Sequence, residues 1–157
     1  MVKLAWMAIP LTQGLYALVD AEDYEQLNQH KWRCQKNRNT YYAVRKEKYK
    51  TIIMHRQILD IQKGQIADHR NNVGLDNRRY NLRHCSASQN QANRKQTKNS
   101  LSKYKGVSRI YINKWRARIT KNGKEIRLGS YKTEIEAALA YDKAARKLFG
   151  EFAHLNF

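Results

Sequence analysis

Cysteine, proline and acidic residues are scarce in this sequence, and it contains no long apolar run. The two cysteines, Cys34 and Cys85, lie far apart, which excludes a disulfide framework and a zinc site built from Cys-x-x-Cys pairs. One proline and seven glycines argue against a long disordered chain. No segment reaches the roughly 20 apolar residues of a membrane span, and the apolar stretch 4–9 is too short for a secretory core. We therefore expect a cytoplasmic protein without a signal peptide or membrane contact.

Basic residues greatly outnumber acidic ones. The 157 residues include 31 Lys and Arg against 13 Asp and Glu, giving a formal net charge of +18. The charge is uneven, because residues 1–28 are net acidic whereas 29–99 and 100–157 are both net basic. Such an excess favours a polyanionic partner, and nucleic acid is the first candidate. An RNA-binding basic protein remains an alternative, which would bind duplex RNA and duplex DNA equally well.

The N-terminal third has the pattern of a small β-rich region. Residues 8–19 predict two short strands around Thr12, Gln13 and Gly14. Asp20 is a candidate N-cap for a short helix, and residues 32–34, 41–45 and 49–54 predict a three-stranded meander. Aromatic residues alternate with basic ones there, which fits either a stacking surface for bases or an ordinary sheet with aromatics inward. We favour the ordinary sheet, and a packing role for His55 beside a short helix at 56–61.

Polar residues with ligand chemistry gather between residues 67 and 94. Asp68 and His69 are adjacent and precede a turn-rich stretch. The residues 81–85 then predict a short strand. Ser86 and Gln89 have the spacing of a capping box, which predicts that a helix begins there. Asn90, Asn93 and Arg94 fall on or just after this helix, so the pattern is strand, loop, strand, helix.

The segments DHRNNVGLDNRRYNLR and SASQNQANR, preceded by Met54-His55-Arg56, resemble the His-Asn-His (HNH) homing endonucleases over residues 52–95. The resemblance implies a ββα-metal (His-Me finger) unit that cleaves DNA. It also implies that Asp68 and Asn90 hold Mg²⁺ or Mn²⁺, with Asn90 at the position where the motif has its final His. Hard divalent cations accept such oxygen ligands.

The same resemblance gives His69 the role of general base, since an imidazole titrates near neutral pH. Asn81 matches the central Asn of the motif and is expected to hold the loop and orient the His69 ring, while Asn77 and Asn93 are candidates for similar structural work. Arg94 is expected to reach the phosphate. His84 is a rival base, which we rank below His69.

The C-terminal part predicts a separate unit after a polar, basic linker at 95–102. Residues 104–110, 114–120 and 125–129 predict three strands, and Asn122-Gly123 is a strong hairpin signal. Thr133 and Glu136 predict a capped helix over 134–149 that ends at Gly150. The apolar period of this helix is carried by Ile135, Ala138, Tyr141, Ala145 and Leu148.

The segments YKGVSR, KWRARI, LGSYKTEIEAALAYDKAARKLFG and AHLNF resemble the Apetala-2/ethylene-response-factor DNA-binding domain over residues 103–157. That family places a three-stranded antiparallel sheet, packed on one helix, in the DNA major groove. Strand alternation turns Trp115, Ala117, Ile119, Ile126 and Leu128 toward the helix. The candidate DNA-binding residues are Lys105, Ser108, Arg109, Arg116, Arg118, Thr120, Lys124 and Arg127.

The plant target sequence should not transfer, because Ser108 replaces an Arg and Arg118 replaces a Glu of the plant pattern. Arg side chains bidentate to guanine would each discriminate by about 1–3 kcal/mol, although any single Arg could instead contact phosphate or solvent.

These observations predict an α+β protein with two domains: a nuclease domain at 1–98, with its motif at 52–95, and a sheet-and-helix DNA-binding domain at 99–157. We expect a site-specific, divalent-metal-dependent endonuclease of the homing type that acts on double-stranded DNA. The alternative is a DNA-binding regulator whose nuclease unit does not cleave. We expect a monomer, with a dimer as the alternative state.

Overall fold

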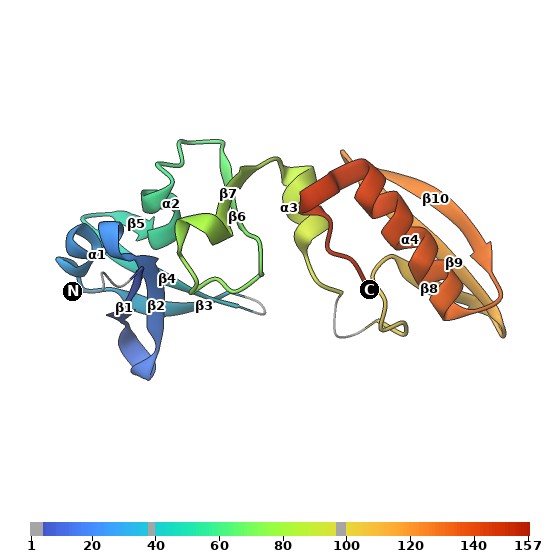
Figure 1. Ribbon diagram of the computed structural model, residues 1–157, viewed down its shortest axis with the longest axis horizontal. Helices are drawn as coiled ribbons and strands as arrows, with labels where there is room; N and C mark the ends of the chain where they lie inside the picture. Colours follow the sequence, from blue (N-terminus) through green and yellow to red (C-terminus); the bar gives the residue numbers. More distant parts are fainter. Residues whose placement is uncertain (1–4, 38–39, 97–99) are drawn as a thin grey trace. The chain divides into compact units, whose positions relative to one another are not determined.

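The computed structural model describes residues 5–37, 40–96 and 100–157, and it has the α+β fold expected from the sequence. The chain divides into two compact units, Met1–Cys85 and Ser86–Phe157 (Figure 1). The border expected from the sequence, between residues 98 and 99, comes later in the chain than this division. None of the helices in the described ranges is long and apolar enough to cross a membrane.

The first unit consists of short strands and helices. In chain order these are β1 (Trp6–Pro10), β2 (Tyr16–Asp20), α1 (Ala21–Asn28), β3 (Arg33–Asn37), β4 (Thr40–Glu47), β5 (Lys50–Ile53), α2 (Met54–Ile58), β6 (Ile66–His69) and β7 (Leu82–Cys85). The expected N-terminal hairpin is present as the β1–β2 pair, and the expected meander as the β3–β4–β5 sheet. β6 and β7 form a separate antiparallel pair.

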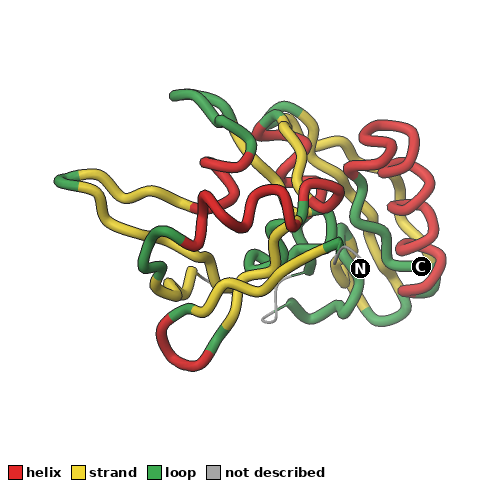
Figure 2. The backbone as a smooth tube through the Cα atoms, turned by 60° about the vertical axis from the view of Figure 1, so that its left-hand side comes forward, coloured by secondary structure: helices red, strands yellow, loops and turns green. Residues whose placement is uncertain are grey.

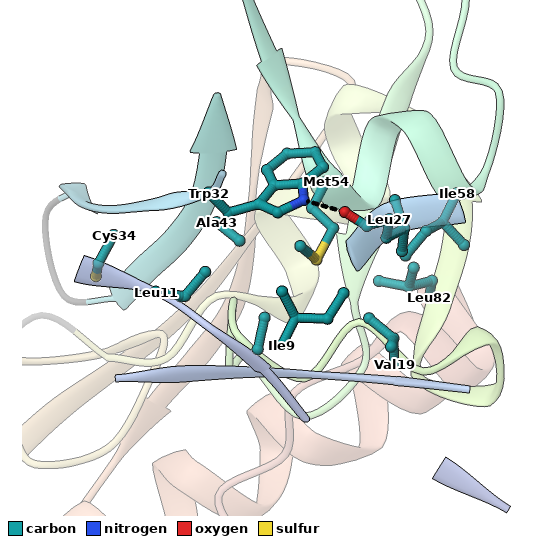
Figure 3. Close-up of a cluster of buried hydrophobic side chains, with 11 residues drawn as sticks. Ile9, Leu11, Val19, Leu27, Trp32, Cys34, Ala43, Met54, Ile58 and Leu82 are labelled. Carbon is teal, nitrogen blue, oxygen red and sulfur yellow. Dashed lines mark hydrogen bonds between the residues drawn. The ribbon is translucent and has the colours of Figure 1, made fainter. Parts of the chain in front are cut away.

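The core of the first unit gathers side chains from the N-terminal hairpin, α1, the meander and α2. Figure 3 shows Met54 pointing into this cluster, between Trp32 and Ile9. Met54 is fully buried, and Ile9 is 1% exposed. The Trp32 indole Nε1 donates a hydrogen bond of 2.8 Å to the Leu27 carbonyl, which satisfies its polar atom inside the core. Leu82 of β7 joins the same cluster, so the hairpin that follows the meander shares its core.

Asp20 precedes α1 as expected, but its side chain does not cap that helix. Its Oδ2 accepts a hydrogen bond of 2.6 Å from the backbone N of Arg79 instead. The sequence pattern for an N-cap was therefore correct for the helix start and wrong for the side-chain contact. His55, expected just before the second helix, is the second residue of α2.

The second unit contains α3 (Ala87–Asn93), β8 (Val107–Tyr111), β9 (Lys114–Lys121), β10 (Lys124–Tyr131) and α4 (Glu134–Phe149). The strands form an antiparallel sheet with β9 in the centre, and α4 packs along it (Figures 1 and 2). Helix α4 has the bounds expected from the sequence. The Thr133 side chain accepts from the Glu136 N, and the Glu136 side chain accepts from the Thr133 N, so the predicted capping box is formed.

Two apolar residues that were expected between the sheet and α4, Ile126 of β10 and Ile135 of α4 itself, are more exposed than their pattern suggested. Ile126 is 38% exposed because it lies close to the end of the β9–β10 hairpin, and a register shift follows between Arg127 and Gly129. Ile135 is 54% exposed, since it lies at the margin of a stripe that is centred on Ala138 and Tyr141. The small residues Ala117, Ala137 and Ala138 are fully buried there, so sheet and helix approach closely.

Helix α3 is built into the second unit. Ser86 and Gln89 form the predicted capping box at its start. Ala92 is 6% exposed and belongs to the same core cluster as Ile119 and Tyr141. Its carbonyl accepts a hydrogen bond of 3.1 Å from the backbone N of His154. These contacts explain why the division of the chain falls before this helix.

The C-terminal tail is fixed by a buried acid of α4. Asp142 is 3% exposed, and its carboxylate accepts hydrogen bonds of 2.9 Å from the backbone N of Asn156 and of Phe157. The Asn156 Oδ1 in turn accepts a bond of 2.7 Å from the Lys105 N. The tail thereby connects α4 with the residues that precede β8.

Candidate functional site

Asp68 and His69 form the end of β6, and both side chains are 6% exposed. β6 pairs with β7 so that Asp68 lies opposite Arg83 and His69 lies opposite Leu82. The Arg83 Nε and Nη2 both donate to the Asp68 Oδ2, at 2.9 and 2.8 Å. The pairing offsets part of the cost of removing both charges from water, and loss of either partner would leave a buried charge unpaired. The sequence did not indicate that Asp68 would have this partner.

The His69 ring is hydrogen-bonded to a fully buried amide. Its Nε2 lies 3.1 Å from the Asn77 Oδ1. The Asn77 Nδ2 donates to the Met54 Sδ at 3.4 Å, which directs the amide oxygen toward the histidine. An amide oxygen only accepts, so the His69 Nε2 is the protonated nitrogen and the basic lone pair is on Nδ1. The sequence had assigned ring orientation to Asn81, but the structure places Asn77 in this contact.

Aromatic rings surround His69. The centroid of its ring is 4.8 Å from that of His55 and 5.8 Å from that of Tyr42. Burial lowers the pKa of His69, while its hydrogen bond to the Asn77 Oδ1 and the charge of Asp68 oppose that shift. Burial, followed by the charge of His69, lowers the pKa of His55 to about 3. His69 is therefore neutral at pH 7 and has the protonation state that a general base needs.

Asn81 holds the turn-rich loop, as the sequence predicted. Its Nδ2 donates to the Asp76 carbonyl at 2.7 Å and to the Asn71 Oδ1 at 3.0 Å. Its Oδ1 accepts from the Asn71 N at 3.0 Å. Because Asn81 is 1% exposed, these bonds form inside the protein, where an unpaired amide would be costly.

Asp76 is a structural residue that the sequence analysis missed. Its carboxylate, 4% exposed, accepts from the Arg78 Nε at 2.7 Å, from the Arg78 Nη2 at 2.8 Å and from the Asn71 Nδ2 at 2.8 Å. The hydrogen bond from Arg78 is the main cause of the lowered pKa of Asp76. An acid two residues before an Arg in an otherwise Asn-rich turn was the available sequence signal.

The loop between β6 and β7 is bound to the N-terminal hairpin. The Leu18 N donates to the Leu75 carbonyl and the Asn77 N donates to the Leu18 carbonyl, both at 2.8 Å. Arg79 adds a bidentate contact to Asp23, at 2.9 and 2.6 Å. β2 and α1 therefore help to hold the segment that carries Asn77.

Gly74 brings the same loop onto β4. Its N donates to the Thr40 Oγ1 at 3.0 Å. A Cβ at this position would lie 2.4 Å from the Tyr41 carbonyl oxygen and 2.6 Å from the Tyr42 Cε1. The close approach requires glycine and places the loop backbone against Tyr42, the ring that also packs on His69.

Asn90 and Arg94 belong to the second unit. Asn90 is a half-buried residue of α3, and Arg94 is the exposed C-cap of that helix. His84, the rival base, is exposed on β7. Asn93 is 3% exposed.

No group of three or more His, Cys, Asp or Glu side chains with the geometry of a metal centre occurs within residues 5–37, 40–96 and 100–157. The resemblance implies a carboxylate oxygen from Asp68, in the first unit, and an amide oxygen from Asn90, in the second unit. Mg²⁺ accepts oxygen ligands, keeps several waters and commonly uses only one or two carboxylates. Each of these two oxygen donors has the chemistry that fits such an ion, and the Asp68 carboxylate already accepts hydrogen bonds from Arg83.

The sheet of the second unit presents a polar face away from α4. By register, Ser108 lies opposite Arg116, Arg118 opposite Arg127, and Thr120 opposite Glu125. These residues alternate with the buried Ala117 and Ile119, as expected. The Arg118 Nη1 is 2.9 Å from the Glu125 Oε2, and both side chains are about half exposed. Arg118 therefore points away from α4, as the strand alternation predicts.

Two polar atoms of this face are buried without a hydrogen-bond partner in the described residues: the Ser108 Oγ and the Arg116 Nε. Such atoms are rare in folded proteins.

Three further candidates lie elsewhere. Lys105 directs its ammonium to the Ala92 carbonyl at the end of α3. Arg109 pairs with Trp115 on the opposite side of the sheet, and its guanidinium lies 5.9 Å from that ring. Lys124 is the first residue of β10, opposite Lys121, and its side chain points to the other side of the sheet from Glu125.

Residues 102–151 match the family model described as the AP2 domain. The chain is 50% identical over 60 residues to dehydration-responsive element-binding protein 2D of Arabidopsis thaliana, and 48% identical over 60 residues to dehydration-responsive element-binding protein 2E of Oryza sativa subsp. japonica. Each match covers 37% of this chain, but only 29% and 19% of the respective plant protein.

Another match is longer and extends over sequence from both units. An uncharacterized HNH endonuclease of Acanthamoeba polyphaga mimivirus is 33% identical over 150 residues, which cover 92% of this chain and 76% of the viral protein. The chain therefore belongs to the HNH endonucleases that carry a C-terminal AP2 domain.

Proposed function

We propose that this protein is a site-specific, divalent-metal-dependent DNA endonuclease of the homing type, in which a ββα-metal unit cleaves and the C-terminal sheet selects the site. The observation that carries the proposal is the setting of His69. It is a buried, neutral imidazole at a strand end whose Nε2 is engaged by Asn77, which leaves Nδ1 as the basic nitrogen. This arrangement suits a residue that accepts a proton from an attacking water.

In this proposal Asp68 and Asn90 supply oxygen ligands to Mg²⁺ or Mn²⁺. When bound, the ion neutralises negative charge on the scissile phosphate. His69 accepts the proton at Nδ1, and Asn81 holds the loop that carries Asn77. Arg94, exposed at the end of α3, contacts the DNA phosphate. We propose that one copy of the chain acts on double-stranded DNA.

For DNA recognition we propose that the polar face of the β8–β9–β10 sheet lies in the major groove. Ser108, Arg116, Arg118, Thr120 and Arg127 share that face by register. Arg118 is the best candidate for base contact because it is central and exposed, and its ion pair with Glu125 is weak enough to exchange for a base.

Plasmid nicking tests the cleavage proposal. We expect the wild-type protein to relax supercoiled plasmid carrying its site with Mg²⁺ and not with EDTA. His69→Ala should abolish nicking, whereas His84→Ala removes an exposed imidazole of the same β6–β7 pair and should keep it. Equal nicking by wild type and His69→Ala would refute the assignment of the base.

DNA binding has a separate test. Arg118→Ala should weaken binding to the cognate site more than to random duplex, because a base contact is lost. A competition assay with the two duplexes measures the difference. Equal loss on both would show that Arg118 holds a phosphate.

The second candidate function is a DNA-binding regulator whose first unit does not cleave. The buried Asp68–Arg83 pair favours it, because Arg83 already supplies the charge partner that an ion would provide. This candidate predicts site-specific binding without nicking by the wild-type protein in Mg²⁺ or Mn²⁺. The plasmid assay above therefore decides between the two functions.

A further inference from the structure

A basic pocket in the second unit lies apart from the polar face of the sheet. Its volume is about 430 Å³, and it is formed by the segment after α3, the residues before β8 and the C-terminal tail. The side chains that matter here are Lys95, Lys103, Tyr104, Lys105, His154 and Asn156. No acidic residue belongs to this lining.

The pocket is built on the last turn of α3. The Lys105 Nζ and the backbone N of His154 both donate to the Ala92 carbonyl, and the Lys105 Nζ also lies 3.4 Å from the Gln91 carbonyl. The Asn156 side chain accepts from the Lys105 N, which fixes the backbone on the other side. Lys105 and His154 are thereby held next to each other by hydrogen bonds to common elements.

The lysines of this pocket, Lys95, Lys103 and Lys105, form no ion pair with an acid among the residues that the structure describes. Burial and then the charge of Arg94 lower the pKa of Lys105 to about 8. Burial, followed by the charges of Lys105 and Lys95, lowers the pKa of His154, and Asp142 opposes this only as the smallest influence. The charges of Lys105 and Lys95 therefore disfavour protonation of His154.

We infer that this pocket binds a phosphate group, and specifically a backbone phosphodiester of the DNA that the protein binds. Lysine ammonium groups bind phosphate as point charges, and a bound anion would offset the effect of Lys105 and Lys95 on His154. Lys103, whose Nζ lies 5.1 Å from the centroid of the Tyr104 ring, is exposed at the rim and can reach a strand. The inference deepens, and rests on, the DNA binding proposed above.

A phosphate contact positions a protein on DNA without reading its sequence. Lys103→Ala in the full-length protein should therefore weaken cognate and random duplex alike. It should also reduce the slope of log K against log salt by about 1. Lys143→Ala is the matched control, because it removes one exposed lysine of α4 outside this pocket. It should leave the slope unchanged. If the two variants changed the slope equally, the change would reflect only the loss of one positive charge, and the inference would be overturned.

A second measurement reports the pocket directly. The pKa of His154 can be followed by NMR in the full chain, with its resonances assigned through a His154→Gln variant. Addition of inorganic phosphate, or of duplex DNA, should raise this pKa because a bound anion offsets Lys105 and Lys95. The rise should be smaller in Lys103→Ala and unaltered in Lys143→Ala.

The outcomes separate the sources of phosphate. If neither inorganic phosphate nor DNA changed the pKa of His154, the proposed phosphate site would be overturned. A rise with inorganic phosphate but not with bound DNA would overturn the assignment to the DNA backbone. If the wild-type protein bound no DNA while phosphate still raised the pKa of His154, the proposed DNA binding would fail and the anion site would stand.

Discussion

At the scale of single residues, the orientation of the His69 ring depends on the Asn77 amide, which is itself oriented by the Met54 sulfur. The Asn77 Nδ2 bonds the Met54 Sδ, and Met54 belongs to the core shown in Figure 3. The core therefore determines which nitrogen of His69 carries the proton. A side chain far from solvent is in this way part of the proposed chemistry.

Asn77→Ala tests that dependence. Removing the amide leaves the His69 Nε2 without this acceptor, so both tautomers become populated and nicking should fall by about 10- to 100-fold. The ¹⁵N chemical shifts of the His69 ring should change from one tautomer to a mixture. Asn77→Asp keeps an acceptor and should retain the original tautomer. An unchanged tautomer in Asn77→Ala would contradict the assignment.

His55 predicts how stability depends on pH. Its pKa is lowered to about 3 in the folded protein from 6.5 in the unfolded chain. The unfolded chain therefore binds more protons between these values, and the stabilising contribution is complete above pH 6.5 and is lost as pH falls toward 3. The melting temperature should drop between pH 7 and 5. His55→Phe, which cannot titrate, should show a smaller drop; an equal drop would assign the effect to other groups.

At the scale of elements, local signals predicted most of the fold. The capping boxes at Ser86 and Thr133 and the helix over residues 134–149 depend on neighbours within a few residues, and all three were confirmed, although Ile135 of the apolar period is exposed. Asp20 shows the limit of prediction from such local signals. Its position before α1 was predictable, but its actual partner, the Arg79 N, is 59 residues away.

The candidate site was predictable in its residue types and less so in its contacts. The motif indicated His69 and Asn81, and the structure places Asn81 on the loop as expected. The contacts of Asn77 with Met54 and of Asp68 with Arg83 depend on how strands pair and on which side chains the core excludes. Spacing along the chain does not encode such long-range contacts.

The cap of α4 makes a quantitative prediction. Thr133→Ala removes the acceptor for the Glu136 N and should lower the free energy of unfolding by about 1 kcal/mol. Urea unfolding followed by circular dichroism would measure it. Asp20→Ala serves as the contrast, since Asp20 does not cap its helix; it should loosen the Arg79 segment instead. No loss of stability in Thr133→Ala would show that packing alone holds α4.

At the scale of the whole chain, α3 makes the second unit larger than its AP2 match at residues 102–151. A fragment of residues 86–157 should resist urea better than one of residues 99–157, because the shorter fragment exposes the apolar surface that Ala92 covers on Ile119 and Tyr141. Comparison of the two unfolding midpoints tests this. Equal midpoints would mean that α3 adds nothing to the unit.

The bonds between Leu18 and the segment of Leu75 and Asn77 have a consequence for the history of this chain. A cassette cut at residues 52–95 would leave behind β2, the strand that braces the Asn77 backbone. If the motif alone were transferred into another gene, the Asn77 backbone would lose its hydrogen bond to β2, and the contact of Asn77 with His69 would be less well held. Recombination that keeps these bonds must also carry the hairpin of β1 and β2, so ancestry should be traced through that hairpin together with the motif.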